Sequence, residues 1–152
     1  MYRYRKILVP LDGSELAECA LPVVRDMAKA GDVWALILLK IVEINITTWK
    51  LMKGVDYFKV RETIFDQSQQ YLKGVKSKLS SDVFEISTEV IESYKPAHVI
   101  CDYAQKKNVT LIAIATHGYT GMKKMLLGSV AFRVLHESHV PILLIRPESC
   151  KA

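Results

Sequence analysis

Two loops of the sequence carry residue types that can bind a phosphorylated small molecule. The first, Pro10-Leu11-Asp12-Gly13-Ser14, follows a short apolar segment. The Asp12 carboxylate is suited to accept hydrogen bonds from a ribose hydroxyl or a base amino group. Asp and Ser are also preferred at helix caps and in turns, so this loop alone favours a structural cap over a binding site.

The second loop contains Gly118 and ends at Gly128-Ser129, where a helix is expected to begin. Glycine lets backbone N–H groups approach a phosphate closely, and a helix N-terminus carries partial positive charge. Ser129 offers a hydroxyl, and Lys123 and Lys124 offer charge if the loop folds over the site. The alternative is that these glycines only make turns and that Ser129 only caps the helix. The residue types alone do not decide between the two interpretations.

Other motif templates do not fit the sequence. The P-loop pattern and the G-x-G-x-x-G fingerprint of dinucleotide-binding domains are both absent. Ser129 lacks the G-x-S-x-G turn of a serine hydrolase, and His136 and His139 lack the spacing of a zinc protease. With no convincing general base or nucleophile near either loop, the pattern favours a binding function over a fast enzyme.

Alternating strand and helix patterns position these loops. Apolar runs rich in Ile and Val predict buried strands, and 3.6-residue periodicity predicts helices between them. Pro22 lies inside the first helical pattern and predicts a kink there. We expect strands over residues 6–11, 33–42, 83–91, 110–116 and 142–145, and helices over 15–30, 56–79, 96–107 and 129–138. This order predicts an open parallel α/β sheet of about five strands, with helices on both faces.

Length and composition limit the remaining possibilities. A chain of 152 residues, 50% of them hydrophobic, suits one domain over residues 1–152 and excludes a disordered chain. Its longest apolar run, residues 33–39, is far shorter than the roughly 20 residues of a membrane span. No signal-peptide pattern is present and the three cysteines are scattered, so we expect a cytoplasmic protein with reduced thiols. The net charge of +5 is spread along the chain, so a nucleic-acid partner is not expected.

Three segments resemble the universal stress protein family over nearly the full length of the chain. They are K-I-L-V-P-L-D-G-S near the start, P-A-H-V-I-C-D-Y-A-Q-K-K-N-V-T-L-I-A-I-A-T-H-G, and L-L-G-S-V-A-F-R-V-L-H-E-S-H-V-P-I-L-L-I-R-P near the end. ATP-binding members share the pattern G-x₂-G-x₉-G-[ST]. Gly118, Gly128 and Ser129 match its last three positions, but Ala115 stands at the first. The resemblance therefore raises the expectation of nucleotide binding, while the Ala115 methyl group lies where the family's backbone meets the nucleotide.

The resemblance also implies a fold, a ligand and a set of site residues. The fold is Rossmann-like, of the adenine nucleotide alpha hydrolase-like type, with strand order 3-2-1-4-5. Asp12 would hold the ribose or the adenine edge, Ile41 would pack on the base, and Gly118, Gly128 and Ser129 would bind phosphates. The full set of expected nucleotide-binding residues is Pro10, Leu11, Asp12, Ile41, Ala115, His117, Gly118, Gly128, Ser129, Val130 and Ala131.

The expected function is an adenine-nucleotide-binding regulatory switch in a stress response. ATP is the expected ligand, with Mg²⁺ held through its phosphates because the sequence shows no carboxylate cluster. The resemblance implies a homodimer through the last strand, and the apolar segment around Trp49 is a candidate extension of that interface. A further protein partner is expected but not named by the sequence. Two alternatives stay open: a dimeric interaction protein that does not bind nucleotide, and a slow ATP hydrolase.

Overall fold

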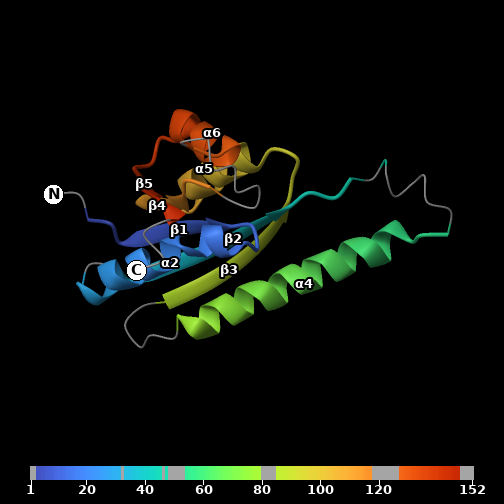
Figure 1. Ribbon diagram of the computed structural model, residues 1–152, viewed down its shortest axis with the longest axis horizontal. Helices are drawn as coiled ribbons and strands as arrows, with labels where there is room; N and C mark the ends of the chain where they lie inside the picture. The colour runs from blue at the N-terminus through green and yellow to red at the C-terminus, as the bar shows by residue number, and fades with distance from the viewer. Residues whose placement is uncertain are drawn as a thin grey trace.

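Five strands form the centre of the computed structural model (Figure 1). The structure describes residues 3–31, 33–45, 47, 54–79, 85–117 and 127–147. The strands are β1 Lys6–Leu11, β2 Ala35–Val42, β3 Glu85–Glu92, β4 Leu111–Ala115 and β5 Ile142–Ile145. The helices are α1 Glu15–Glu18, α2 Ala20–Lys29, α4 Tyr57–Lys78, α5 Pro96–Lys106 and α6 Ser129–Glu137.

The sheet is parallel throughout, and its strand order is β3-β2-β1-β4-β5. This confirms the expected α/β fold and strand order. From β1 the chain winds outward to β2 and β3, then returns to the other side of β1 for β4 and β5. The direction of winding therefore reverses between β1 and β4, which is where open parallel sheets bind their ligands.

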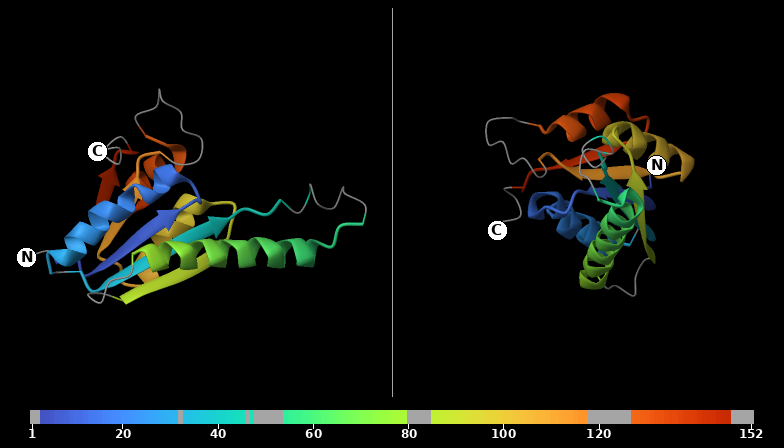
Figure 2. Two further views of the ribbon diagram at one scale, coloured as in Figure 1. Left: turned by 60° about the horizontal axis from the view of Figure 1, so that its bottom comes forward. Right: turned by 90° about the vertical axis from the view of Figure 1, so that its right-hand side faces the viewer.

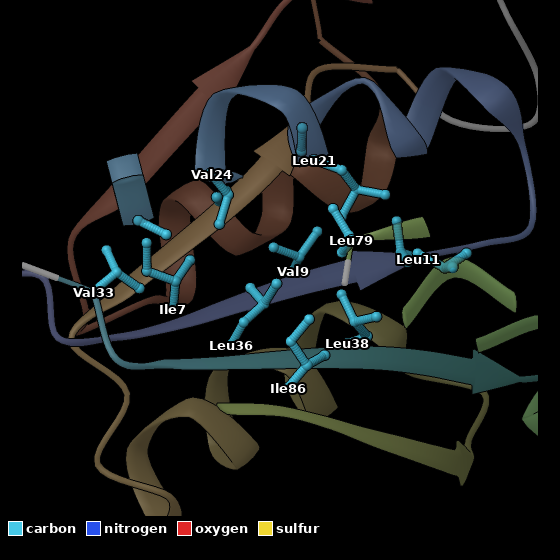
Figure 3. Packing of buried hydrophobic residues seen from close by; sticks show 14 of the residues in the cluster. Ile7, Val9, Leu11, Leu21, Val24, Val33, Leu36, Leu38, Leu79 and Ile86 are labelled. Atoms are coloured by element: carbon cyan, nitrogen blue, oxygen red, sulfur yellow. The ribbon is translucent and has the colours of Figure 1, made fainter. Parts of the chain in front are cut away.

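Helices cover both faces of the sheet, as Figure 2 shows in its end-on view. Alternate residues of β1 point to opposite faces. Ile7 and Val9 pack in a core with α2 and the C-terminal part of α4. Leu8, between them, packs in a second core with α5 and α6. Figure 3 shows the first core, in which Val24 of α2 and Leu36 of β2 meet the β1 side chains.

The first helical segment is interrupted where the sequence predicts only a kink. Pro22 has no N–H to donate to the carbonyl one turn earlier. The interruption falls at Cys19, whose N–H donates to the Leu16 carbonyl over 3.3 Å. Cys19 keeps helical dihedral angles, φ −60° and ψ −19°, so α2 continues after a single residue. Gly31, at φ +105°, follows the end of α2 as predicted.

One of the two described cysteines differs from the sequence-based prediction. Cys19 is disulfide-bonded, so the prediction of reduced thiols is wrong for this residue. Its sulfur lies 3.7 Å from the carbonyl oxygen of Pro147, which brings the segment after β5 next to the start of α2. Cys101 is free, and burial together with the Glu137 carboxylate raises the pKa of its thiol.

The buried residues of the long helix α4 lie in its C-terminal half, while Tyr57 and Arg61 near its start bond to Glu92 at the end of β3. These buried residues are Ser68, Leu72 and Val75. The N-terminal half extends beyond the ends of the strands (Figure 2), and Phe58 is 78% exposed there. Asp56 caps the helix by accepting a hydrogen bond of 3.0 Å from the Phe58 N–H. Trp49, named from the sequence as a candidate interface residue, lies outside the described residues.

Candidate functional site

A cavity of about 430 Å³ lies at the carboxyl ends of β1, β2 and β4, beside the reversal of winding. The structure brings ten of the eleven sequence-predicted residues together around it, and Gly118 lies outside the described residues. The volume of the cavity falls within the roughly 300–1,000 Å³ that is typical of small-molecule sites. The ten residues are Pro10, Leu11, Asp12, Ile41, Ala115, His117, Gly128, Ser129, Val130 and Ala131.

Seven further residues line the cavity that the sequence did not single out. Leu39 had a signal, because it is two residues before Ile41 and therefore lies on the same face of β2. Pro96 and Ile100 had none, since only the tertiary fold brings α5 beside β2. The seven residues are Ala17, Leu39, Glu43, Pro96, Ile100, Ile114 and Thr116.

The cavity lining is divided chemically by element. The side chains from β2 and α5, such as Ile41, Pro96 and Ile100, are apolar and suit a flat ring system. The polar groups come from the loops after β1 and β4 and from the first turn of α6. This lining fits a ligand with an apolar ring at one end and polar or charged groups at the other.

Hydrogen bonds within its own loop hold the Asp12 carboxylate in place. Its Oδ1 accepts from the Ser14 backbone N–H at 2.9 Å and from the Ser14 hydroxyl at 2.6 Å. The Ser14 hydroxyl oxygen in turn accepts from the Ala17 N–H at 3.1 Å and caps α1. Gly13 completes the turn at φ +91°, a conformation that favours glycine. Ser14 is therefore the cap, and the exposed Asp12 carboxylate is oriented at the cavity wall.

A small polar cluster of Lys40, Ser68 and Tyr71 lies near Gly13 of this loop. The Lys40 ammonium donates to the buried Ser68 hydroxyl over 3.2 Å and lies 5.5 Å from the centre of the Tyr71 ring. A side-chain carbon at Gly13 would lie 3.9 Å from the Lys40 Nζ. Burial raises the pKa of Tyr71 and the Glu18 carboxylate adds to it, so the phenol stays neutral at physiological pH. The cluster thus connects α4 with the turn that carries Asp12.

The start of α6 is joined directly to the end of β4. The Gly128 N–H donates to the Thr116 carbonyl over 2.6 Å, and a side-chain carbon on Gly128 would lie only 3.1 Å from that oxygen. Gly128 occupies the N-cap position and Ser129 is the first helical residue, so Ser129 does not cap α6 through its side chain. The Thr116 hydroxyl lies 3.0 Å from the Nδ1 of His117, which also lines the cavity.

Ala115 is the last residue of β4 and is 5% exposed. It lines the cavity and pairs with Ile145 of β5. Its methyl group is therefore part of the cavity wall beside Thr116. No group of three or more potential metal ligands occurs within the described ranges, so these residues offer no protein cage for a cation. None of the described helices is long and apolar enough to span a membrane.

Comparisons with known proteins agree with the fold. The model of the universal stress protein family matches residues 3–146. The chain is 32% identical over 143 residues to universal stress protein MJ0531 of Methanocaldococcus jannaschii, covering 94% of this chain and 82% of that protein. It is 28% identical over 149 residues to universal stress protein YxiE of Bacillus subtilis, covering 94% and 99%.

Solved structures extend the likeness to three dimensions. The protein MJ0577, also from Methanocaldococcus jannaschii, superposes with a TM-score of 0.81 at 27% identity, covering 95% of this chain and 96% of that one. An Arabidopsis thaliana family member, solved with AMP bound, has a TM-score of 0.66 at 14% identity, with coverages of 93% and 91%. A universal stress protein in complex with cAMP has a TM-score of 0.65 at 17% identity, with coverages of 95% and 98%.

Proposed function

The chain belongs to the universal stress protein family, and from this premise we propose that it binds an adenine nucleotide in the cavity between β1, β2, β4 and α6. The observation that carries the proposal is that a single cavity combines the apolar wall of β2 and α5 with the oriented Asp12 carboxylate and the first turn of α6. The AMP and cAMP complexes of structurally similar proteins support the same class of ligand.

The lining suggests a role for each part of the nucleotide. Ile41, which lines the cavity together with Pro96 and Ile100, packs on the adenine ring. Asp12 accepts from the ribose hydroxyls, because its carboxylate is held at the carboxyl end of β1. Ser129 and the neighbouring N–H groups of α6 donate to the phosphates, as helix N-termini do for anions. Mg²⁺ is held mainly by phosphate oxygens in this proposal.

A regulatory switch fits this site better than a fast enzyme. The described lining residues that could act as a base or nucleophile are Asp12, Glu43, Thr116, His117 and Ser129. The Asp12 carboxylate already accepts two hydrogen bonds from Ser14, and the Thr116 hydroxyl lies within hydrogen-bonding distance of His117. We therefore propose a homodimeric stress-response protein that acts through nucleotide binding and a further protein partner. We propose a cytoplasmic location on the family's general character. The disulfide at Cys19 is unusual for that compartment, and Cys19 is not a lining residue of the cavity.

A second candidate function rests on Ala115. A methyl group in place of the family's first glycine narrows the cavity beside Thr116. If it excludes the nucleotide, the chain acts as a dimeric interaction protein. A nucleotide titration of the wild-type protein therefore distinguishes the nucleotide-binding protein from the interaction protein.

The experiment is titration calorimetry with ATP and AMP, together with mass spectrometry of any nucleotide released on denaturing the purified protein. Asp12→Asn removes one charge while keeping an oxygen for the Ser14 hydrogen bonds, and we expect it to weaken nucleotide binding about tenfold or more. Glu15→Gln is the matched control, because Glu15 carries the same charge three residues away and does not line the cavity. Absence of binding by the wild-type protein at millimolar nucleotide would favour the interaction protein.

A further inference from the structure

Lys40 of β2 lies at the same end of the sheet as the cavity but on the opposite face. Its neighbours in sequence, Leu39 and Ile41, line the cavity. Side chains alternate along a strand, so Lys40 points to the face that α4 covers (Figure 1). In the sheet it pairs with Leu11, the last residue of β1. Lys40 is therefore close to the site without lining the cavity.

Contacts with α4 hold the Lys40 ammonium in place. It donates over 3.2 Å to the hydroxyl of Ser68, which is 2% exposed, so this bond lies inside the packing of α4 on the sheet. The Tyr71 ring, 5.5 Å from the ammonium, adds a cation–π contact. Burial raises the pKa of Tyr71, and the Glu18 and Asp12 carboxylates raise it further, so both carboxylates lie within electrostatic reach of this cluster. The half-buried ammonium is thus fixed by groups that compensate its charge.

The fixed end of Lys40 lies against the turn that carries Asp12. A side-chain carbon at Gly13 would lie 3.9 Å from the Lys40 Nζ and 4.0 Å from its Cε. The two bonds from Ser14 to Asp12 shape this turn from within, because all three residues belong to one loop. Lys40 belongs to the neighbouring strand and is bonded to α4. It therefore supports the turn from outside the loop and sets its position relative to the sheet.

We infer that Lys40 is a positioning residue of the nucleotide site, which holds the Gly13 turn where the Asp12 carboxylate can accept from the ribose hydroxyls. The inference rests on the proposed function, because it explains how the proposed ribose contact is set. Lys40 acts through Gly13 and does not touch the ligand. Its bond to Ser68 makes α4 part of the same support.

The test compares ATP with 2′,3′-dideoxy-ATP, which lacks the ribose hydroxyls, by titration calorimetry. Lys40→Met keeps an unbranched side chain and removes the ammonium. We expect this variant to lose about fivefold or more in ATP affinity, while its affinity for dideoxy-ATP changes less than about twofold. Lys73→Met is the matched control, because Lys73 is an exposed lysine of α4 that does not line the cavity, and it should bind both ligands as the wild type does.

Two further variants separate positioning from a general effect on folding. Lys40→Arg keeps a positive charge and a donor at this place, and its ATP affinity should stay within about twofold of the wild type. Ser68→Ala removes the acceptor of the Lys40 bond and should weaken ATP binding in the same selective way. It carries the comparison if Lys40→Met does not fold, which thermal unfolding without ligand measures.

The outcomes distinguish this inference from the proposed function. If the wild type binds ATP and Lys40→Met binds it equally well, or loses affinity for ATP and dideoxy-ATP by the same factor, the positioning role is overturned and the nucleotide site stands. An Arg variant as weak as the Met variant would also overturn it. If the wild type binds neither ligand, the proposed function is wrong and the inference falls with it.

Discussion

At the scale of single residues, Gly128 has a structural reason to be glycine that does not depend on a ligand. Its N–H donates to the Thr116 carbonyl at 2.6 Å, and the same oxygen leaves little room for a side-chain carbon on Gly128. A β-branched residue here would disturb the junction of β4 and α6 as well as any bound phosphate. Loss of binding in such a variant therefore does not by itself identify a phosphate contact.

Gly128→Ala should lower the free energy of unfolding by about 1–3 kcal/mol, because the new methyl group would lie 3.1 Å from the Thr116 carbonyl oxygen. Gly74→Ala on α4 is the control, since no atom lies within 4 Å of the added carbon apart from adjacent residues and the backbone of the same helix. Alanine in that helix should raise stability by about 0.4–1 kcal/mol. Urea denaturation measures the free energy of unfolding of the wild type and of both variants. A Gly128→Ala variant as stable as the wild type would show that the backbone at Gly128 accommodates the methyl group.

Ala115→Gly tests the departure from the family motif. Removing the methyl group widens the cavity beside Thr116, and we expect ATP affinity to rise a few-fold. The same change should cost about 0.5–1 kcal/mol of stability, because glycine loses more backbone freedom on folding. Calorimetry and urea denaturation on one preparation measure both effects. Unchanged or weaker binding would mean that the nucleotide does not approach position 115.

The residue scale also shows what the sequence can and cannot predict about a site. The sequence predicts Asp12 and Ser129 as lining residues because their chemistry and their positions, after a strand and at the start of a helix, are local features. Pro96 and Ile100 were missed because α5 reaches the cavity only through the folding of the whole sheet. The alternative roles also needed coordinates, since only hydrogen-bond geometry shows that Ser14 is the cap of α1 and that Asp12 is not.

At the scale of elements, the short helix α1 fixes the turn that presents Asp12. Ser14→Ala removes both the cap on the Ala17 N–H and the 2.6 Å hydrogen bond to Asp12. We expect stability to fall by about 1 kcal/mol and nucleotide binding to weaken, because Asp12 loses one of its two bonds from Ser14. Ser14→Thr keeps a hydroxyl at the cap and should retain most of both properties. Thermal unfolding with and without ATP would measure the two effects. A Ser14→Ala variant that binds ATP normally would show that nucleotide binding does not depend on the cap.

The elements themselves were largely predictable, and the exceptions have physical causes. Strands β1 and β5 agree with their predicted ranges because their apolar runs end at turn residues. Asn108, at φ +53°, terminates the α5 segment as expected. The interruption at Cys19 was not placed correctly, because the missing proline N–H leaves its gap one turn before Pro22. The sequence gives the position of the proline, but the helix is interrupted one turn earlier, near the carbonyl that would have accepted a hydrogen bond from it.

At the scale of the whole molecule, β5 is the last strand of the sheet, and no other described strand pairs with its outer side. The N–H groups of Ile112 and Thr116 donate to the carbonyls of Pro141 and Ile145. Backbone groups alternate in direction along a strand, so those of Ile142 and Leu144 point away from β4. Both side chains are only partly buried. An apolar edge of this kind pairs readily with another strand.

We expect two copies of the chain to pair through these edges, antiparallel about a twofold axis, as the family resemblance implies. Ile142→Pro removes one outward N–H and leaves the hydrogen bonds to β4 in place, so it should give a folded monomer. Ile142→Ala keeps the N–H and should remain a dimer, which separates backbone pairing from side-chain packing. Leu144→Lys should also give a monomer, because it places a charge on the same edge. Sedimentation at micromolar concentration distinguishes monomer from dimer. A wild-type mass near 17.2 kDa would exclude the dimer. A dimer that persists in both the Ile142→Pro and the Leu144→Lys variant would place the interface on another surface.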